Sequence, residues 1–463
     1  MEYKINKNID PDIFRGYDIR GIYGKDLDES VAYTIGLGYG SYIQDKGYTK
    51  CIIGHDNRAS SIPLSDALIQ GITQTGVDVE FLGLVTTPMY YFAQTTEYVM
   101  GSKHFVLAPG IMITASHNPK EYNGFKVTFD DFGNACGKMI QDFRIYIEAG
   151  NFKSGKGKVI KRDIRQGYLD LIEKSISMGD KKIKAVVDAG NGTTSIIAKE
   201  AFEKMGVEVV PLFCDSDPNF PNHHPDPSVE ENNRFLKQAV LDNHADVGIG
   251  LDGDGDRVGI VDEKGNMVFA DFYAIIIWRN IMKDATNKHA LFDVKCSKSL
   301  ADEIVKLGGI PVCYRTGNSY MKAKMREGKF DFGNELSGHV FFYDRWPNID
   351  DGIYAGLRLI EILSKTDKTV SQLLEGVNHY YSTPEIKIPT DDDIKFKKVD
   401  KVIKYCKDKK YNINTIDGVR AEFNDGWALV RASNTGPNIT ARFEGKTEEA
   451  MEKLKNEFLG LLK

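Results

Sequence analysis

The chain has 463 residues, of which 41% are hydrophobic and 27% charged, with a formal net charge of -6. A single hydrophobic core rarely grows to this length, so roughly three or four domains are expected. The composition is that of a globular protein, the negative charge argues against nucleic acid as the main partner, and no apolar run approaches the ~20 residues of a membrane span.

Targeting and cysteine signals are absent from the sequence. The first residues, MEYKINKNIDPDIF, contain no apolar signal-peptide region, so a cytoplasmic protein without a membrane partner is expected. The six cysteines are scattered and form no CxxC pair. Buried free thiols are therefore expected, rather than a zinc site or a disulfide framework.

The run Gly36-Leu37-Gly38-Tyr39-Gly40 is the first glycine-rich segment of the chain. It resembles a dinucleotide loop only superficially, because no strand precedes it and the GxGxxG spacing is missing. The run lies inside a helical pattern. It therefore predicts two helices in close contact.

Three segments share one pattern, in which a short apolar strand is followed by a polar loop and an amphipathic helix. They are residues 51–56 before 62–73, 185–190 before 194–205, and 290–295 before 298–307. Each predicts a strand-loop-helix unit of a largely parallel sheet. Their recurrence in successive parts of the chain indicates a repeated α/β domain.

Residues 113–119, Ile-Thr-Ala-Ser-His-Asn-Pro, place the small nucleophile Ser116 in a polar turn. Most serines in turns are only turn formers, but here the segment Asn123-Gly124-Phe125-Lys126 returns a lysine to the same region. No G-x-S-x-G elbow surrounds the serine, so acyl transfer is disfavoured. Ser116 is the candidate nucleophile.

The loop Asp252-Gly-Asp254-Gly-Asp256-Arg257 carries three carboxylates at alternate positions. If they converge, each like-charge pair costs roughly 1 kcal/mol in water and ~4 kcal/mol at an effective dielectric near 20. A bound cation would remove this cost. Carboxylate oxygens suit Mg²⁺, with Ca²⁺ or Mn²⁺ as further possibilities. The alternative is a solvent-exposed acidic turn.

An EF-hand competes for the same residues, because Glu263 falls at the twelfth loop position. Arg257 occupies the sixth place, where the sharp turn needs glycine, and residues 245–251 have the pattern of a strand rather than a helix. The EF-hand is therefore rejected. A hydroxyl nucleophile beside a hard-cation site, without a purine-nucleotide motif, predicts phosphoryl transfer on a small molecule.

Two later loops carry polar side chains suited to a substrate. In residues 333–339, Glu335, Ser337 and His339 could bind sugar hydroxyls or simply cap local backbone. In residues 431–436, Arg431, Ser433, Asn434 and Thr435 follow a strand directly and could hold a phosphate, or form an ordinary hairpin loop.

The C-terminal part has a different pattern. Residues 419–423 and 427–431 are joined by Asn424-Asp425-Gly426, which predicts a hairpin. A strand at 439–444 and a helix at 448–462 follow. The lysine-rich stretch 395–410 has an apolar stripe and predicts a solvated helix of this domain rather than a nucleic-acid patch. An antiparallel α+β domain is expected.

In order and spacing, these motifs resemble the α-D-phosphohexomutase superfamily, and within it the phosphomannomutase/phosphoglucomutase group. The resemblance also includes residues 14–21 and 219–227 and extends over essentially the whole chain. It implies three related mixed α/β-sheet domains and a C-terminal antiparallel α+β domain around a central cleft. The boundaries expected for these domains are 1–160, 161–263, 264–374 and 375–463.

The resemblance also implies a chemistry. Ser116 would be carried as phosphoserine, with one Mg²⁺ per chain held by Asp252, Asp254, Asp256 and an oxygen on Ser116. Hexose 1,6-bisphosphate would be the intermediate and activator, and the 6- and 1-phosphates of mannose or glucose would be interconverted. Hexose phosphates are the expected partners of a monomer or weak homodimer. The alternatives are a phosphoglucosamine mutase and, more remotely, a non-catalytic binding protein on the same fold.

Matched by position, the loop with Glu335 and Ser337 would recognise the sugar, and Arg431, Ser433, Asn434 and Thr435 would hold the non-reacting phosphate. Further substrate contacts are expected from Tyr17, Arg20, Lys295 and His339. A general acid/base should lie among the matching cleft positions, which are Tyr17, Arg20, Lys126, Arg257, Lys295 and His339. The candidate catalytic residues are Ser116, His117, Lys126, Arg257 and His339. One position departs from the family, because Asn318 stands where relatives often have His, and no proton-transfer role is assigned to it.

Overall fold

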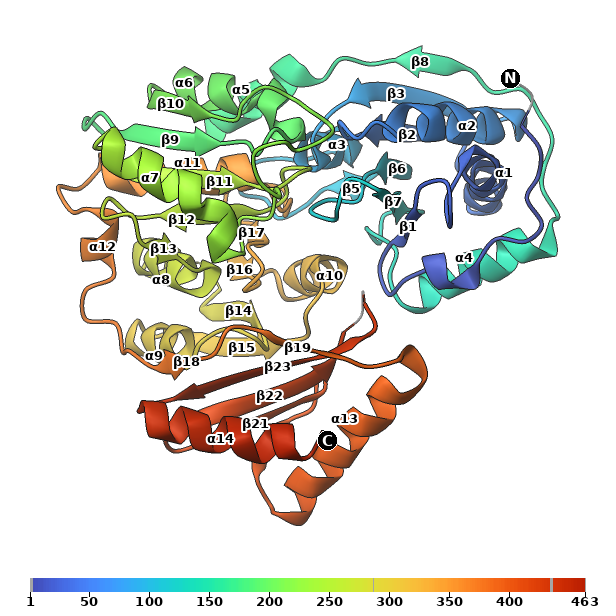
Figure 1. The fold of residues 1–463 in the computed structure, drawn as a ribbon. Coiled ribbons are helices and arrows are strands. Elements are labelled where there is room, and N and C mark those ends of the chain that lie inside the picture. Colours follow the sequence, from blue (N-terminus) through green and yellow to red (C-terminus); the bar gives the residue numbers. More distant parts are fainter. Residues whose placement is uncertain (1–2, 286, 434–435, 463) are drawn as a thin grey trace.

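The computed structural model describes residues 3–285, 287–433 and 436–462, apart from the side chains of residues 392 and 393. Four sheets of four to six strands, and one two-stranded ribbon, follow each other along the chain. In Figure 1 the N-terminal domain, from blue to teal, lies to the right, and the red C-terminal domain lies below the rest. The four-domain α/β architecture expected from the sequence is confirmed.

The first domain is built on a six-stranded sheet. Its strands run in the order β1 (Ile19–Ile22), β7 (Tyr122–Thr128), β6 (Gly110–Ile113), β2 (Lys50–His55), β3 (Asp78–Leu84) and β8 (Val159–Lys161). Its helices are α1 (Glu29–Asp45), α2 (Ser61–Gln74), α3 (Thr87–Gln94) and α4 (Lys138–Ala149), and the ribbon is β4 (Thr95–Thr96) with β5 (Val106–Leu107). The first predicted strand-loop-helix unit corresponds to β2 and α2.

The second domain has a five-stranded sheet in the order β10 (Glu208–Leu212), β9 (Lys184–Asp188), β11 (Val247–Leu251), β12 (Val258–Val261) and β13 (Met267–Val268). Its helices are α5 (Arg165–Ser175), α6 (Ala198–Lys204) and α7 (Arg234–Asp242). The helix predicted over 194–205 instead begins with a separate 3-10 turn at Thr193–Ile196. Gly192 precedes this turn in an extended conformation, and Ile197 interrupts the helical angles before α6 begins.

The third domain has a four-stranded sheet in the order β15 (Ile310–Tyr314), β14 (His289–Asp293), β16 (Phe332–Asn334) and β17 (Val340–Phe342). Helices α8 (Ala270–Ile281), α9 (Lys298–Lys306), α10 (Asn318–Gly328), α11 (Gly352–Ser364) and α12 (Val370–Leu373) surround it. The predicted unit at 290–307 corresponds to β14 and α9.

The three sheets share one topology. In each, the first strand of the repeat lies between the second and the third and is parallel to both, while a fourth strand pairs antiparallel with the third. The equivalent sets are β3-β2-β6-β7, β10-β9-β11-β12 and β15-β14-β16-β17. The predicted repeat of mixed α/β domains is confirmed, and the turn between third and fourth strand falls at the same edge of each sheet.

The C-terminal domain is antiparallel, as expected. Its sheet runs β18 (Tyr381–Ser382), β23 (Asn438–Gly445), β22 (Gly426–Ala432), β21 (Val419–Phe423) and β20 (Asn412–Asn414), with β19 (Ile386–Pro389) also paired to β23. Phe423 pairs with Gly426, so the predicted hairpin turns at Asn424 and Asp425. Helices α13 (Asp392–Asp408) and α14 (Glu448–Gly460) correspond to the two predicted helices.

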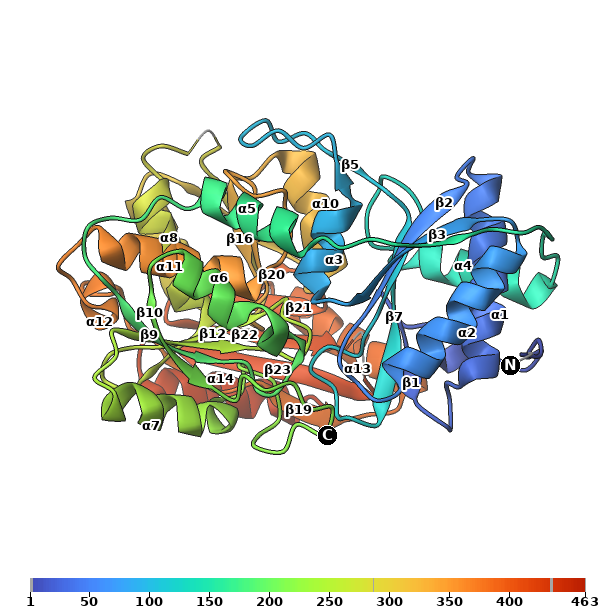
Figure 2. The ribbon, with the colours of Figure 1, turned by 90° about the horizontal axis from the view of Figure 1, so that it is seen from above.

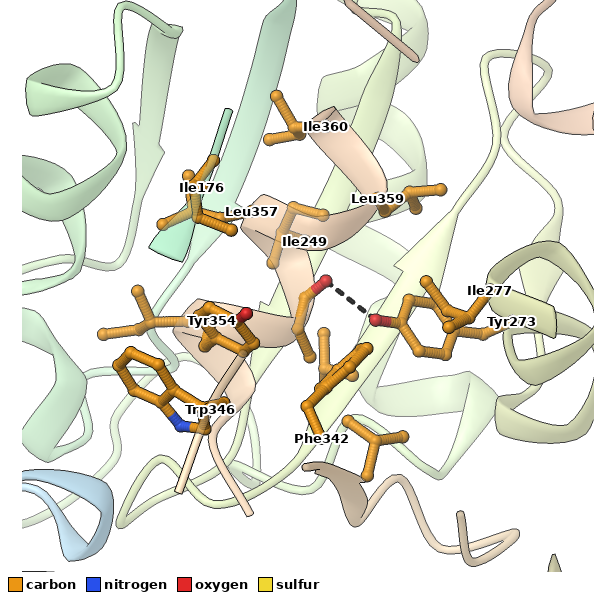
Figure 3. Packing of buried hydrophobic residues seen from close by; sticks show 14 of the residues in the cluster. Ile176, Ile249, Tyr273, Ile277, Phe342, Trp346, Tyr354, Leu357, Leu359 and Ile360 are labelled. Carbon is orange, nitrogen blue, oxygen red and sulfur yellow. Dashed lines mark hydrogen bonds between the residues drawn. The ribbon is translucent and has the colours of Figure 1, made fainter. Parts of the chain in front are cut away.

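A buried helix joins the second and third domains into one body. Every residue of α11 is buried, and the helix packs against β11 and β12 of the second sheet as well as against α8 of the third domain. Figure 3 shows this core, in which the rings of Trp346 and Tyr354 stack 4.0 Å apart and the Tyr273 hydroxyl donates to the Ala355 carbonyl over 2.8 Å. The second and third domains therefore share one hydrophobic core, although they are consecutive parts of the sequence.

The C-terminal domain has a core of its own and is attached through the loop that follows β14. Arg420 donates to the carbonyls of Val294 and Cys296 over 2.6 and 2.8 Å. Trp427 packs beside Val294, and Glu444 accepts hydrogen bonds from the Ser297 hydroxyl and the Lys298 amide. This docking is smaller and more polar than the shared core, which is the arrangement expected of a domain that can move.

Two further findings concern membrane-spanning helices and cysteines. No helix in the described part of the chain is both long and apolar enough to cross a membrane. All six cysteines are free, and Cys51, Cys296 and Cys406 are buried. The expectation of free thiols is confirmed, with full burial for three of them.

The glycine run at 36–40 packs helix α1 against α2, as predicted (Figure 2). A Cβ added to Gly36 would lie 2.3 Å from the Leu68 carbonyl oxygen, and one added to Gly71 would lie 2.3 Å from the Tyr33 carbonyl oxygen. Both contacts are with backbone, which cannot rotate away. The two helices therefore approach more closely than any side chain at these positions would allow.

Gly36→Ala should lower the thermal midpoint of unfolding by a few degrees. Alanine gains ~1 kcal/mol in helix propensity, but overpacking costs about 1–3 kcal/mol, and here the clash is with backbone. Gly460→Ala is the control, because no atom lies within 4 Å of its added Cβ, and it should be neutral or stabilising. A Gly36→Ala midpoint at or above wild type in calorimetry would contradict this account of the packing.

Candidate active site

A cleft of about 660 Å³ lies where the four domains meet. Residues from each domain line it, and they include most of those singled out in the sequence: Tyr17, Arg20, Ser116, His117, Lys126, Arg257, Lys295, Glu335, Ser337, His339, Arg431 and Ser433. Asp252, Asp254 and Asp256 lie directly behind Ser116 and are fully buried. The predicted Asn434 and Thr435 lie outside the described residues.

The repeated topology explains why three unrelated motifs meet in one place. Ser116 follows β6, the acidic loop follows β11, and the loop from Glu335 to His339 follows β16. These are the third strands of the three sheets, and each loop leads into the antiparallel fourth strand. The same turn in each domain thus carries a nucleophile, a set of carboxylates, or polar groups that face the cleft.

Ser116 has a backbone conformation that is rare for its residue type. Its φ is +52°, in the left-handed region, and its amide donates to the Thr114 hydroxyl over 2.8 Å. Its Oγ donates to Asp252 Oδ2 over 3.0 Å and lies 3.0 Å from His117 Nδ1. A Cβ added to Gly253 would lie 2.5 Å from the Ser116 carbonyl oxygen, so the two loops touch through a glycine.

Arg58, which sequence reasoning missed, holds the serine loop in this shape. Its buried guanidinium is paired with Asp56 and donates to four backbone carbonyls of the loop, those of Ser116, Asn118, Pro119 and Tyr122. All five N–H groups are used in this way. The sequence does place Asp56 and Arg58 at the end of the first predicted strand, but it does not show which loop their side chains contact.

The three aspartates converge, as the sequence suggested. Each offers a carboxylate oxygen within 4.8 Å of those of the other two, and all three side chains are fully buried. The alternative of a solvent-exposed acidic turn is therefore wrong. Glu263, the twelfth residue of the rejected EF-hand, instead accepts hydrogen bonds from Thr369 and Ser371 beside α12.

Lys126 places a positively charged side chain beside the three carboxylates, which the sequence alone did not reveal. Its ammonium group lies 2.8 Å from Asp254 Oδ2 and 2.5 Å from Asp256 Oδ2. Burial alone would lower the pKa of Lys126, but Asp254 and Asp256 together raise it well above its usual value. Part of the carboxylate repulsion is thus relieved by this lysine.

The remaining oxygens fit a divalent cation. Asp254 Oδ1 and Asp256 Oδ1 are buried and accept no hydrogen bond, and Asp252 Oδ2 accepts one from Ser116 and has the Arg257 side chain 3.9 Å away. Burial, followed by the charges of Asp256 and Asp254, raises the pKa of Asp252 well above its usual value, so negative charge is still in excess. Converging, donor-free carboxylate oxygens are the ligands that hard cations such as Mg²⁺ prefer.

Two histidines flank the serine loop. Burial, together with Arg257 and Arg20, holds the pKa of His117 well below its usual value, so its imidazole is neutral. His339 Nε2 lies 3.0 Å from Arg257 Nε. Both rings face the cleft, so both remain candidates for moving a proton there.

Where the third and the C-terminal domains line the cleft, cationic groups are held by acids that the sequence did not reveal. Lys295 Nζ lies 2.8 Å from Glu385, and Arg431 Nε lies 2.9 Å from Asp417. Asp417 also accepts from the Thr316 amide of the third domain over 3.0 Å. Neither acid belongs to a recognisable motif.

Burial raises the pKa of Glu335, whose carboxylate accepts from the Gly317 amide.

Comparison with known proteins covers nearly the whole chain. Family models for phosphoglucomutase/phosphomannomutase match residues 11–152 and 166–265 (alpha/beta/alpha domains I and II), 270–380 (alpha/beta/alpha domain III) and 385–461 (C-terminal domain). A phosphomannomutase/phosphoglucomutase of Pseudomonas aeruginosa is 40% identical over 97% of this chain and 95% of its own, and a phosphoglucomutase of Neisseria gonorrhoeae is 38% identical over 98% and 97%.

The fold agrees with these matches. The crystal structure of a phosphoglucomutase/phosphomannomutase family protein from Burkholderia thailandensis superposes with a TM-score of 0.89 at 37% identity, covering 99% of this chain and 97% of the other. All four domains, in the same order, are thus shared with relatives of similar length. The chain belongs to the phosphoglucomutase/phosphomannomutase family of mutases.

Proposed function

We propose that this protein interconverts hexose 6-phosphates and hexose 1-phosphates of mannose, glucose or both, through a phosphoserine at Ser116 and a hexose 1,6-bisphosphate intermediate. The observation that carries the proposal is the contact between Ser116 Oγ and the buried carboxylate cluster, at the floor of a cleft lined by all four domains. A hydroxyl nucleophile beside a hard-cation site suits phosphoryl transfer. The names of the similar relatives support the substrate class.

In the first half-reaction, a sugar hydroxyl attacks the phosphorus on Ser116 while the bond from phosphorus to Ser116 Oγ breaks. The hydroxyl proton passes to a neutral group at the cleft, for which His339 and His117 are the candidates. The intermediate then presents its other phosphate to Ser116, and the reverse transfer returns both phosphate and proton. No water is consumed, so the reaction is an isomerisation.

Asp252, Asp254, Asp256 and the Ser116 oxygen would hold one Mg²⁺, which when bound would neutralise charge on the transferring phosphoryl group. Lys126 adds a fixed positive charge beside the same carboxylates. Arg58 and Thr114 hold the serine in its strained conformation, so the nucleophile is oriented before substrate arrives.

Arg431 and Ser433 are suited to grip the phosphate that is not reacting, and Asp417 orients the arginine for this. Glu335 and Ser337 are suited to bind sugar hydroxyls. The earlier alternative of a phosphoglucosamine mutase is not favoured, because the similar relatives carry the mannose and glucose names.

Ser116→Ala should reduce turnover by several orders of magnitude while leaving the fold intact, because it removes the only phosphate carrier proposed. Intact-mass analysis of the active wild type should show one phosphate, and peptide mapping should place it on Ser116. Ser102→Ala, at an exposed turn of the same domain, is the control and should keep both phosphate and activity. Active wild-type protein that never carries phosphate on Ser116 would refute the mechanism.

Asp254→Asn should abolish most activity and shrink the rise in thermal midpoint that Mg²⁺ produces, because a ligand charge is lost. The metal-free variant should also be less stable. Burial would raise the pKa of Asp254, but Lys126 and hydroxyl donors hold it below its usual range, so its charge is favourable even without metal. Asp262→Asn is the matched control, since this buried carboxylate caps a turn outside the cluster. An undiminished Mg²⁺ effect in Asp254→Asn would contradict the site.

Arg431→Ala should lower kcat/KM by about 10- to 150-fold, which corresponds to ~1.5–3 kcal/mol for a hydrogen bond to a charged group. The loss should be equal for mannose and glucose phosphates, because the phosphate is held rather than the sugar. Glu335→Gln should instead change the ratio between the two sugars. A coupled assay with both substrates measures this, and a sugar-specific loss at Arg431 would count against the division of roles.

A further inference from the structure

Asp350 is a fully buried carboxylate for which the proposed function has no role. It lies between β17 and α11, pairs by a backbone bridge with Phe341, and is not part of the cleft lining. Its immediate neighbour Asp351 caps α11 and faces another way, toward Tyr168. A buried carboxylate needs specific partners, because burial without them is costly.

The partners of Asp350 point to His339. Asp350 Oδ2 lies 3.1 Å from His339 Nδ1 and accepts from the Asn318 amide over 3.1 Å, while Oδ1 accepts from Lys322 Nζ over 3.0 Å. Lys322 also lies 3.6 Å above the ring of Tyr91, so its ammonium group is fixed from two sides. Asp350 therefore stays charged, and it presents one oxygen to the histidine.

The other side of the imidazole fixes where its proton lies. His339 Nε2 is 3.0 Å from Arg257 Nε, and a guanidinium can only donate, so Nε2 must accept. The ring proton is then on Nδ1. Both groups near Nδ1 are acceptors, Asp350 Oδ2 at 3.1 Å and Asp256 Oδ1 at 3.6 Å, and both lie at ion-pair distance without hydrogen-bond geometry. A neutral His339 thus has a single tautomer, in which the Nε2 lone pair accepts the hydrogen bond from Arg257 at the edge of the cleft.

We propose that Asp350 is a positioning residue that holds His339 in the Nδ1–H tautomer, with Nε2 turned toward the cleft beside Arg257. This inference rests on the proposed function. A carboxylate that orients a histidine in this way contributes through the histidine and never touches the substrate itself.

The arrangement also gives a role to Asn318, the residue that departs from the family pattern. Its side-chain amide donates to Asp350 Oδ2. An amide cannot exchange a proton as an imidazole does, but it can hold a carboxylate in place. At this position the chain therefore has a residue that supports Asp350, and proton exchange is left to other groups of the cleft.

A second cation is the alternative occupant of this region, because Asp256, His339 and Asp350 each offer an atom within 4.8 Å of the others. Asp350, however, already has Lys322 and Asn318 as donors, whereas the free oxygens of Asp254 and Asp256 belong to the other cluster. The protein's own lysine thus already supplies the positive charge that a second ion would bring to Asp350.

Asp350→Asn tests the inference on the intact protein, with Asp351→Asn as the matched control. Asp351 is also buried and accepts from the Tyr354 amide and the Tyr168 hydroxyl, so its substitution makes the same chemical change one residue away. In Asp350→Asn, kcat for the hexose phosphates should fall roughly 10²- to 10⁴-fold, the usual contribution of a positioned acid or base. KM should change little, because Asp350 does not line the cleft. Asp351→Asn should lower the thermal midpoint but keep kcat near wild type.

A spectroscopic measurement at one pH separates positioning from a purely structural role. In protein labelled with ¹⁵N-histidine, the His339 signals, identified by their loss in His339→Gln, should show Nδ1 protonated and Nε2 bare in wild type. They should show another tautomer or a mixture in Asp350→Asn. An Nε2-protonated His339 in wild type, or an unchanged kcat in Asp350→Asn, would overturn the inference.

Cation binding gives an independent outcome. Calorimetric titration with Mn²⁺ should find one equivalent per chain in wild type and in Asp350→Asn. A second equivalent that disappears in Asp350→Asn would overturn the inference in favour of a second metal site. If the wild type does not interconvert hexose phosphates, the proposed function fails, but the tautomer measurement still decides how Asp350 acts on His339.

Discussion

The burial of three like charges beside a serine hydroxyl is the constraint on which the rest of this structure depends. Asp252, Asp254 and Asp256 are fully buried and within reach of a single ion. At an effective dielectric near 20, each pair repels by ~4 kcal/mol, so the fold must supply positive charge. Lys126 supplies part of it, and the donor-free oxygens that remain are suited to a metal. The negative charge that Lys126 does not compensate is the charge that a bound cation would neutralise.

The fold satisfies this constraint by repetition. Because each α/β domain turns from its third to its fourth strand at the same edge, three domains bring three different loops to one cleft. Helix α11 fixes the second domain against the third through a shared core, so the acidic loop and the loop of His339 keep their spacing. The C-terminal domain, docked through Arg420, Trp427 and Glu444, brings Arg431 to the same cleft from a separate core.

Sequence reasoning recovered the elements and the short motifs because each rests on local information. The strand before Asp252, the hairpin at Asn424 and Asp425, and the close helix packing at Gly36 are all encoded within a few residues. The order of strands in the three sheets was beyond local patterns, and so was the packing of α11 on the second domain. Both depend on contacts between distant segments.

In the candidate site, too, some residues are indicated by local sequence patterns and others only by contacts between distant segments. Ser116 and the three aspartates were predictable from their spacing, whereas Arg58, Asp350, Glu385 and Asp417 were not, since each is an ordinary charged residue until its partner is known. Lys126 was noticed but its role was not, because only the structure shows it between two of the aspartates. Asn318 was expected to differ from the residue that relatives often have, and the structure shows that its side-chain amide donates to Asp350.

Anomalous diffraction from crystals soaked in Mn²⁺ is the most direct test of the account, because it locates the cation without reference to activity. The account predicts one strong peak between Asp252 Oδ2, Asp254 Oδ1 and Asp256 Oδ1, within bonding distance of the Ser116 oxygen or its phosphate. A peak beside His339 and Asp350 instead, or a carboxylate cluster that stays without metal at saturating Mn²⁺, would contradict it.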